Sequence, residues 1–387
     1  MELGGAERAL LGLLEAIDYS KVSVDLFLMR HSGELIPHIP KEVKLLPEIK
    51  AYTCLAVPFG EVLQKGQFRV AYGRRRGKKE AKKRVQELGL PVDNDVGLEY
   101  SHKYTVKDMP TINDIEYDLA ISFLTPHYFV LEKVKARRKA AWIHTDYAKV
   151  AIDIKSQFEM WKRYDYIIGV SESVADHFTS VFPELTDKVM VIKNMLPMKS
   201  IREQSSAFST EEEMPNDGSI KLLSVGRFCY AKNFDNVPEI CKKIRESGCD
   251  IKWYLIGYGG DESLIRRKIA ESGMEDYVII LGKKDNPYPY IRACDYYVQP
   301  SRYEGYSVSI REAQALAKPV IITAYETSSS QLEDGVDGVI VPMELNACVK
   351  EIGHILQDVG KKQRIMNGCM DRDYSNKDEL PKIYDLI

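Results

Sequence analysis

The sequence predicts an α/β fold of two doubly wound domains, each built on a mostly parallel sheet with helices on both faces. The chain has 387 residues, which exceeds one ordinary domain and suffices for two. Short apolar runs alternate with helix-like stretches along most of it. A polar stretch, residues 199–219, separates two such series and predicts where one domain ends and the next begins.

The second series of apolar runs is the clearer one. Its runs are short, rich in β-branched residues and flanked by glycine or proline, as the buried strands of a parallel sheet are. They occupy residues 221–228, 251–260, 278–282, 296–301 and 319–324. We expect them to form one domain over residues 220–370.

The first series predicts a similar domain over residues 1–198. Its runs occupy residues 22–29, 117–124, 139–145, 166–171 and 188–194. Gly4 and Gly5 form a turn that opens a helix to about Ile17, and such a turn normally follows a strand. Since no strand precedes this turn, we expect the first sheet to lack its first strand or to fill that place irregularly.

The connections between the two domains follow from composition. Residues 199–219 are polar, contain proline and glycine and show little apolar periodicity, so we expect an interdomain linker. Residues 371–387 form a C-terminal segment that we expect to cross back to the first domain. Two doubly wound domains joined in this way face each other across a cleft at the carboxyl ends of their sheets, where ligands bind.

Composition restricts the class of protein. The formal net charge of −3 argues against a dedicated nucleic-acid binder. The seven cysteines are odd in number and have no close metal-ligand spacing, which indicates a reduced, cytosolic chain without a metal site. No apolar run approaches the roughly 18–20 residues of a membrane span, and no signal peptide is visible.

The strongest motif is the stretch 302–321, where Glu304 and Glu312 are eight positions apart. Gly305 permits a sharp turn, and Ser307 or Ser309 is suited to cap the helix that follows. Amides at this helix N-terminus form an anion site suited to a diphosphate, and the carboxylates can accept hydrogen bonds from hydroxyls. These amides belong to Gly305, Tyr306, Ser307 and Val308. The alternative is a capped surface helix with two solvated glutamates.

A second motif places two cations across a glycine turn. Arg227 and Lys232 follow the run that begins at residue 221, and both can reach one diphosphate, Arg as a fork and Lys as a point charge. The alternative is two ordinary loop cations.

A third motif follows the apolar run 139–145. His144 lies at the end of the run, where residues of a ligand cleft are found, although a lone histidine there is more often structural. Asp146 is either its orienting partner or a helix cap.

Together these motifs resemble glycosyltransferase family four, a group of retaining enzymes with two Rossmann-like domains, the B fold (GT-B). The resemblance covers nearly the whole chain, in order and in spacing. It includes GGAER at 4–8, WIHTDY at 142–147, VIKNML at 191–196, GRFCYAK at 226–232, LIGYGG at 255–260, NPYPYI at 286–291 and EGYSVSIRE at 304–312. Within the family, the chain is similar to enzymes that build bacterial capsule, exopolysaccharide or lipid-linked oligosaccharide.

The resemblance implies a role for each site residue. Arg227 and Lys232 hold the donor diphosphate, Glu304 contacts the transferred sugar, Glu312 binds the ribose, and His144 contacts the sugar or phosphate near the anomeric carbon. The remaining donor contacts are the four helix amides, Gly4 and Gly5, which let the backbone approach, and Gly282 and Lys283, which begin the stretch that flanks the base. Lys283 departs from the family, which often has an aromatic or small residue there.

The resemblance also implies the reaction. We expect a retaining, metal-independent hexosyltransferase without a cofactor, which uses a UDP-sugar, or alternatively a guanosine donor, and a glycan or lipid-linked acceptor. Two other functions stay open: a nucleotide-sugar epimerase of the same fold, and a non-catalytic donor-binding partner subunit.

Residues 69–84 carry an unusual density of positive charge. Eight cations fall between Arg74 and Arg84, with only Glu80 opposing them. Such a patch is suited to an anionic membrane surface, where each cation contributes about 1 kcal/mol. The protein is then cytoplasmic and peripheral on the inner face of the membrane. A solvated basic helix is the equal alternative, and RNA binding is less favoured because no RNA-binding motif accompanies the patch.

Overall fold

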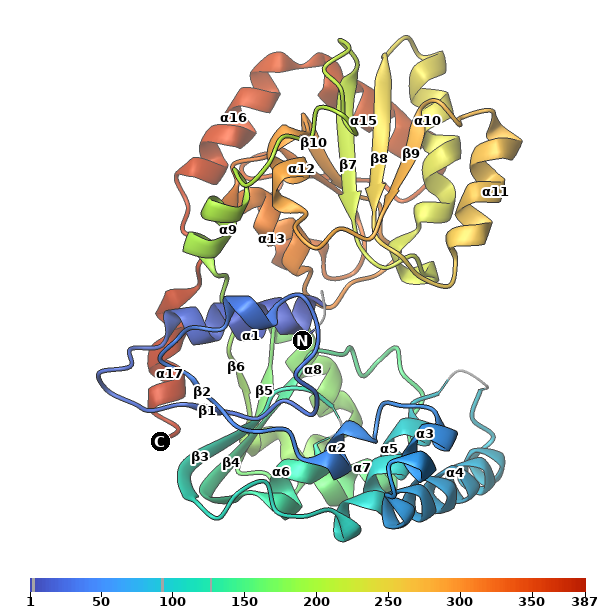
Figure 1. The fold of residues 1–387 in the computed structure, drawn as a ribbon. Coiled ribbons are helices and arrows are strands. Elements are labelled where there is room, and N and C mark those ends of the chain that lie inside the picture. The colour runs from blue at the N-terminus through green and yellow to red at the C-terminus, as the bar shows by residue number, and fades with distance from the viewer. Residues whose placement is uncertain (2–3, 92–93, 126) are drawn as a thin grey trace. The chain divides into compact units, whose positions relative to one another are not determined.

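The computed structural model describes residue 1 and residues 4–91, 94–125 and 127–387 (Figure 1). The chain divides into two compact units: unit 1 comprises Met1–Asn194 and Lys377–Ile387, and unit 2 comprises Met195–Asn376. Each unit contains a parallel sheet with helices between its strands, so the predicted α/β class with two Rossmann-like domains is confirmed. No helix of the described residues is long and apolar enough to cross a membrane.

Unit 1 holds a four-stranded parallel sheet in the order β3-β4-β5-β6, and β1 and β2 form a separate parallel pair. The strands are β1 Asp25–Leu26, β2 Lys44–Leu45, β3 Glu116–Ser122, β4 Lys135–Ile143, β5 Tyr166–Gly169 and β6 Val189–Val191. The helices are α1 Gly5–Ala16, α2 Lys50–Thr53, α3 Phe59–Gln64, α4 Phe68–Leu88, α5 Val96–Thr105, α6 Tyr128–Lys133, α7 Ile154–Trp161, α8 Glu172–Val181 and α17 Leu380–Tyr384.

The start of unit 1 differs from an ordinary doubly wound domain. Gly4 is the N-cap of α1, which begins at Gly5. Among the residues that the structure describes, no ladder joins the β1-β2 pair to the larger sheet. A side-chain bond links them instead, since the Tyr117 hydroxyl on β3 donates to Asp25 on β1 at 2.7 Å. The strand expected over 22–29 is thus only two residues long.

Helices α4 and α5 pack unusually closely. A methyl group at Gly73 would lie 2.8 Å from the Thr105 Cα, and one at Gly77 would lie 2.4 Å from the Tyr100 carbonyl oxygen. With Ala81, these glycines recur at four-residue spacing and form one face of α4. The small residues on that face explain how the backbones of the two helices approach, and they turn the basic residues of α4 toward solvent.

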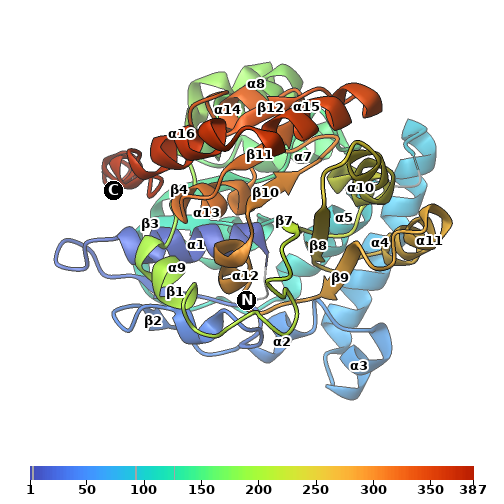
Figure 2. The same cartoon turned by 90° about the horizontal axis from the view of Figure 1, so that it is seen from above.

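Unit 2 holds a six-stranded parallel sheet in the order β12-β11-β10-β7-β8-β9, which the labels in Figure 2 follow. The strands are β7 Ile220–Val225, β8 Ile251–Ile256, β9 Val278–Gly282, β10 Tyr296–Gln299, β11 Val320–Thr323 and β12 Val339–Val341. The helices are α9 Met198–Gln204, α10 Val237–Glu246, α11 Glu262–Ser272, α12 Tyr288–Ala293, α13 Val308–Ala315, α14 Ser328–Gln331, α15 Leu345–Gln357 and α16 Val359–Met370.

The strand order of unit 2 fixes where a ligand can bind. The chain runs outward from β7 through β8 to β9, then returns to β10 beside β7 and runs outward the other way. The point between β7 and β10 is therefore the topological switch point, at whose carboxyl ends the loops diverge and leave a crevice.

The segment expected as a linker belongs to unit 2. Residues 199–219 contain most of α9 and a turn that buries Met214 in the core of this unit. Glu213 in the same turn pairs with Lys284 at 2.5 Å. The sequence of this segment predicted a linker because most of its residues are polar and its few buried residues show no clear helix or strand period.

The C-terminal segment, residues 371–387, is divided between the units, since Lys377–Ile387 group with unit 1. There the Lys382 ammonium donates to the Val191 carbonyl at 3.1 Å. Before it leaves unit 2, the chain passes the start of that unit, and the Leu196 amide donates to the Ser375 carbonyl at 3.1 Å.

Candidate functional site

Two loops meet at the carboxyl ends of β7 and β10. The Asn233 side-chain amide donates to the Pro300 carbonyl at 2.8 Å, and the Arg302 backbone amide donates to the Ala231 carbonyl at 2.7 Å. The Arg302 guanidinium donates twice to Asp235, each time at 2.8 Å. These bonds hold the loop that carries Lys232 against the loop that carries Glu304.

Lys232 and Glu304 are brought into direct contact. The Lys232 ammonium donates to Glu304 Oε1 at 2.5 Å, and the side chains are only 18% and 10% exposed. A pair so far withdrawn from water interacts more strongly than a surface salt bridge does. The residue predicted to bind the phosphate and the residue predicted to contact the sugar therefore lie together in unit 2.

The rest of the Glu304 environment is also built by the loop after β10. The Ser301 hydroxyl donates to Oε1 at 2.6 Å, and the Gln299 amide approaches the same oxygen at 3.5 Å. The Thr327 hydroxyl donates to the Glu304 carbonyl at 2.8 Å. All described bonds of the carboxylate reach Oε1, which orients the group and leaves Oε2 for a ligand hydroxyl.

Glu312 lies on α13 and is fully buried. The Tyr288 hydroxyl on α12 donates to its Oε1 at 2.9 Å. Burial raises the pKa of Tyr297, and the charges of Glu312 and Glu304 raise it further. Both carboxylates therefore act on one buried hydroxyl, so the structure gathers them in one region although they are eight positions apart.

The turn that carries Arg227 is shaped by close backbone approach. A methyl group at Gly257 would lie 1.9 Å from the Gly226 carbonyl oxygen, and Gly257 has φ 153°. The Phe228 amide donates to the Tyr258 carbonyl at 2.8 Å. Arg227 itself is exposed and makes no hydrogen bond with the described residues, so its guanidinium is available to an anion.

The helix N-terminus differs in one respect from the predicted phosphate site. Ser307 is the N-cap of α13, with no hydrogen bond from its side chain to the helix. Its amide donates to the Gln331 side-chain oxygen at 2.9 Å. The amides of Gly305, Tyr306 and Val308 have no such bond among the described residues, whereas Ser307 must exchange Gln331 for a phosphate oxygen before it contributes.

Gly282 and Lys283 lie further along the same edge of the sheet. Gly282 ends β9 with φ 75°, and its carbonyl accepts from the Gly257 amide at 2.9 Å. Lys283 is exposed, and its ammonium lies 5.6 Å from the centre of the Tyr258 ring.

His144, Gly4 and Gly5 belong to unit 1. His144 follows β4, its Nε2 is buried, and its ring lies 4.8 Å from that of Phe123. Burial lowers the pKa of His144 to about 4, so the ring is neutral at neutral pH. Asp146 is not its partner, because its carboxylate lies 2.8 Å from His177 Nδ1 on α8 and accepts from the Ala148 amide at 2.9 Å.

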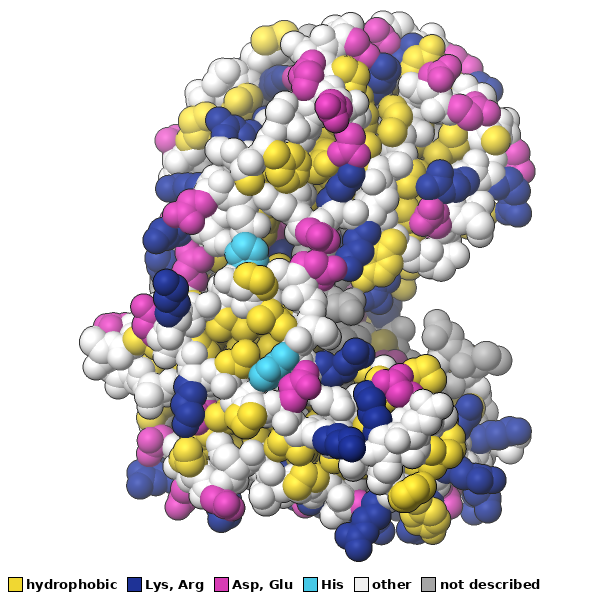
Figure 3. Space-filling view, viewed as in Figure 1, with side chains coloured by type: hydrophobic (Ala, Val, Ile, Leu, Met, Phe, Trp, Pro, Cys, Tyr) yellow, Lys and Arg dark blue, Asp and Glu magenta, His cyan; other side chains and the backbone are white. Residues whose placement is uncertain are grey.

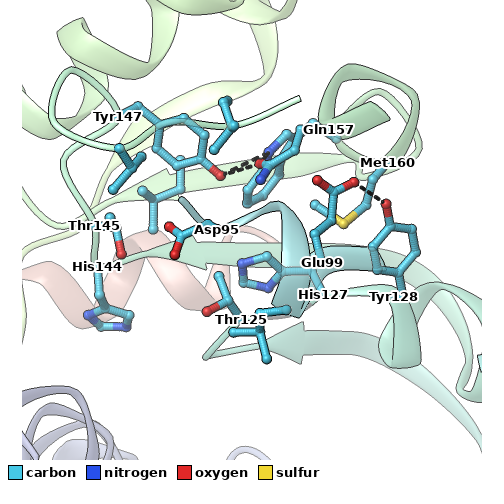
Figure 4. A pocket seen from close by; sticks show the side chains of 15 residues that line it. Asp95, Glu99, Thr125, His127, Tyr128, His144, Thr145, Tyr147, Gln157 and Met160 are labelled. Carbon is cyan, nitrogen blue, oxygen red and sulfur yellow. Dashed lines mark hydrogen bonds between the residues drawn. The ribbon is translucent and has the colours of Figure 1, made fainter. Parts of the chain in front are cut away.

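Sequence reasoning missed several residues that support the site. Ser301 and Gln299 stand in the apolar run before Glu304, and Tyr288 stands in the NPYPYI motif, but their bonds to the two carboxylates depend on the sheet order. It also missed a pocket in unit 1 beside His144 (Figure 4).

Comparisons with known proteins agree with this geometry. Residues 205–368 match the family model described as Glycosyl transferases group 1. The amylovoran biosynthesis glycosyltransferase AmsK of Erwinia amylovora is 28% identical over 131 residues, which are 32% of each protein. N-acetylgalactosamine-N,N'-diacetylbacillosaminyl-diphospho-undecaprenol 4-alpha-N-acetylgalactosaminyltransferase of Campylobacter jejuni is 24% identical over 186 residues, 48% of each protein. The chain spans 32% to 58% of the length of such curated relatives.

A solved structure extends the likeness in fold to nearly the whole chain. The crystal structure of HepE from Anabaena in complex with UDP and glucose has a TM-score of 0.67 and 16% identity, and covers 99% of this chain and 96% of that one. The chain therefore has the GT-B fold, matches the glycosyl transferases group 1 over residues 205–368, and resembles the glycosyltransferases of bacterial polysaccharide synthesis.

Proposed function

We propose that this chain is a retaining glycosyltransferase that moves a hexose-type sugar from a UDP-sugar to a glycan or lipid-linked acceptor in bacterial surface polysaccharide synthesis. The observation that carries the proposal is the contact of Lys232 with Glu304 at the switch point of unit 2, with Glu312 nearby. Similar proteins support the donor and the acceptor class, since HepE was solved with UDP and the Campylobacter jejuni relative is named for a diphospho-undecaprenol acceptor.

The reaction requires that negative charge be neutralised on the departing diphosphate. Lys232, Arg227 and the free amides at the start of α13 supply positive charge at the site, without a metal ion. Among the described residues, no cluster of three or more metal-binding side chains occurs. Independence of metal remains a proposal, which unchanged turnover in EDTA supports and restoration by Mg²⁺ or Mn²⁺ contradicts.

Glu304 acts on the sugar rather than on the leaving group. When a diphosphate binds Lys232, the carboxylate keeps the Ser301 bond and turns its free oxygen to a sugar hydroxyl. Positive charge develops on the sugar ring in an oxocarbenium-like transition state, which a nearby carboxylate stabilises. The acceptor hydroxyl attacks from the face that the diphosphate leaves, and a leaving phosphate oxygen takes its proton.

One assay separates the proposal from the two alternatives. The full chain is incubated with UDP-sugars, with and without an acceptor mixture of lipid-linked and free glycans, and released UDP and sugar are measured. Release that requires acceptor supports the transferase. Release of free sugar or an isomer without acceptor indicates the epimerase, and binding of UDP without turnover indicates a donor-binding subunit.

The base is tested by competition between UDP and GDP. A nucleotide that binds the native chain raises its melting temperature, and at equal concentration the tighter ligand raises it more. We expect the larger rise with UDP, and a larger rise with GDP overturns the choice of donor.

We also propose that α4 brings the enzyme to an anionic membrane that carries the acceptor. Lys and Arg side chains gather over α4 in Figure 3. The helix also exposes Phe68 and Tyr72, which are 68% and 64% accessible. Exposed aromatic and basic side chains on one helix are typical of a surface that lies in the membrane interface. On this proposal the protein works at the cytoplasmic face of the membrane, and nucleic acid is not its partner.

A further inference from the structure

We propose that the pocket of unit 1 beside α5 and α7 binds one uncharged sugar ring of the acceptor. The identification of this sugar as part of the acceptor rests on the proposed function. The binding of a sugar is inferred from the pocket alone. The pocket has a volume of about 170 Å³. It lies at the carboxyl ends of β3 and β4, with α5, α6 and α7 around it (Figure 4).

Two buried polar side chains in the pocket lack a partner at one atom each. The His127 side chain is fully buried, and its Nδ1 lies 2.8 Å from the Ser122 hydroxyl, while Nε2 has no partner among the described residues. Glu99 is 5% exposed, and its Oε1 accepts from the Tyr128 hydroxyl at 2.8 Å and from Ser156, while Oε2 has none. Buried polar atoms in native proteins are almost always hydrogen-bonded, so these two atoms indicate a bound molecule or water.

The two side chains are held in place by a network outside the pocket. Asp153 caps α7 by accepting from the Ser156 amide at 3.2 Å. Its other oxygen accepts from the Tyr100 hydroxyl on α5 at 2.8 Å and from Arg84 on α4 at 2.6 Å. One carboxylate thus fixes three helices together, and the polar atoms of the pocket are positioned before any ligand arrives.

The lining selects the chemistry of the ligand. None of the described residues that line the pocket is Lys or Arg, and the pocket contains the carboxylates of Asp95 and Glu99. A phosphate or carboxylate ligand is therefore repelled. The lining also includes the apolar or aromatic side chains of Tyr147, Met160 and Trp161. Apolar surface for C–H groups together with a few fixed hydrogen-bonding atoms suits a pyranose ring, whose hydroxyls can reach Glu99 and His127.

The protonation states agree with this use. Burial lowers the pKa of His127 to about 3, so the ring is neutral and its Nε2 forms one hydrogen bond to a hydroxyl. Burial raises the pKa of Glu99, and both forms of the carboxyl can bond a hydroxyl.

The test uses two substitutions that keep the internal bonds. Glu99→Gln retains an oxygen for Tyr128 and Ser156 and replaces the acceptor Oε2 with an NH2 donor. His127→Asn retains a nitrogen where Nδ1 now faces Ser122 and removes the atom at the position of Nε2. The control is His102→Asn, since His102 is also buried in unit 1 but does not line the pocket. Binding of glucose, galactose, N-acetylglucosamine and N-acetylgalactosamine is measured by saturation-transfer NMR, and the acceptor KM in the transfer assay.

We expect at least one of these sugars to bind the full chain. Either pocket variant should weaken binding and raise the acceptor KM about 10- to 100-fold, the effect of one lost hydrogen bond to a charged or buried group. UDP binding should stay within about twofold, and the control should change neither quantity. Unchanged sugar binding and KM in both pocket variants overturn the inference and leave a water-filled cavity in an otherwise active transferase.

The two proposals fail in different ways. If the chain transfers no sugar but the pocket binds one in a Glu99-dependent manner, the proposed function is wrong and the sugar site stands. If the chain transfers sugar but no sugar binds in a manner that depends on Glu99 or His127, the proposed function stands and the sugar site is wrong.

Discussion

The Lys232 ammonium donates to the Glu304 carboxylate at 2.5 Å, so the residue proposed to hold the donor diphosphate is bonded to the residue proposed to contact the sugar. Their loops follow different strands, β7 and β10, and are 72 positions apart along the chain. A diphosphate that binds Lys232 competes with this bond. Binding of the donor and release of Glu304 toward the sugar are therefore coupled.

The first prediction concerns Glu304. Glu304→Gln removes the charge but keeps an oxygen for Ser301, so it should lower kcat about 100-fold or more with little change in melting temperature. The measurement is acceptor-dependent UDP release together with a thermal melt. Glu262→Gln on α11 is the matched control, because that glutamate pairs with Arg266 at the surface, and the substitution should leave both quantities unchanged.

The second prediction concerns Lys232 and the pair. Lys232→Met leaves Glu304 as a mostly buried carboxylate without its cation, which should cost up to about 3 kcal/mol of stability as well as activity. Adding Glu304→Gln removes the uncompensated charge. The double variant should therefore melt above Lys232→Met, although it stays inactive. Equal melting temperatures for the two variants would show that the bond contributes nothing to stability.

Sequence patterns singled out Lys232, Glu304 and Glu312 as candidates, but they did not show how these residues meet. The spacing of Glu304 and Glu312 and the turn before Lys232 are local signals, and each stands on its own short segment. The pairing of Lys232 with Glu304 depends on β10 returning beside β7, which no local pattern encodes. The alternatives for Asp146 stayed open for a related reason, since its partner His177 comes from a helix 31 positions away.

The boundary near residue 199 shows a second limit. Polar composition predicts a linker well when a segment buries nothing, but Met214 in residues 199–219 is buried in unit 2. Two buried apolar side chains, Ile201 and Met214, are too few to give a readable period in so polar a segment. The alternation of strands and helices, in contrast, recurs throughout both units, and it is why the fold class could be predicted.

The third prediction concerns Tyr288 and Glu312. Tyr288→Phe removes the hydroxyl that donates to Glu312 Oε1, so the carboxylate loses one bond that fixes its position. If Glu312 binds the ribose, affinity for UDP should fall about 5- to 10-fold, the effect of one hydrogen bond. Calorimetric titration of UDP checks this. Tyr290→Phe on the same helix is the control, because Tyr290 bonds Glu213 instead, and it should leave UDP affinity unchanged.

The fourth prediction concerns the stability of unit 1 in acid. Burial lowers the pKa of three of its histidines, to about 4 for His102 and His144 and to about 3 for His127. Below their unfolded pKa of about 6.5, the unfolded chain binds more protons than the native one. Stability therefore falls as pH decreases from 6.5 toward 4, by about 1.4 kcal/mol per pH unit for each histidine.

Glu99 opposes this trend in part. Its pKa is raised by burial, so the native state holds its proton at higher pH than the unfolded chain does, and this contribution grows as pH falls. Three histidines still outweigh one carboxyl. Unit 2 has one histidine, His354, which is exposed. Limited proteolysis at pH 7 and pH 5 should show unit 1 opening first at the lower pH, and His127→Asn should reduce that difference. Simultaneous opening of both units at pH 5 contradicts the assignment.

The last prediction concerns the membrane. The eight cations of α4 between Arg74 and Arg84 do not act alike. The Arg74 guanidinium donates to the carbonyls of Cys54 and Val57 at 2.8 and 2.7 Å, and Arg84 bonds Asp153, so both serve the fold. Arg76 lies 5.1 Å from the Tyr104 ring. The remaining five are exposed and form what we call the basic face: Arg75, Lys78, Lys79, Lys82 and Lys83.

Replacing the basic face with glutamine keeps the helix propensity of α4 and leaves the bonds of Arg74 and Arg84 intact. Each lost cation should remove about 1 kcal/mol of attraction to an anionic leaflet, so co-sedimentation with vesicles that contain phosphatidylglycerol should be abolished. The control replaces five exposed cations elsewhere by glutamine, with the same change in net charge: Lys135, Arg266, Arg267, Lys350 and Arg364.

The parent chain should bind these vesicles less as salt rises, because the attraction extends only over a Debye length of about 8 Å at physiological ionic strength. It should not bind vesicles of phosphatidylcholine alone. Transfer to a short soluble acceptor should survive in the basic-face variant, since Lys232 and Glu304 lie in unit 2. If this variant sediments as well as the parent, α4 is a solvated helix. If the control loses binding equally, net charge rather than this face attracts the membrane. Loss of vesicle binding in the basic-face variant alone supports α4 as the helix that contacts the membrane.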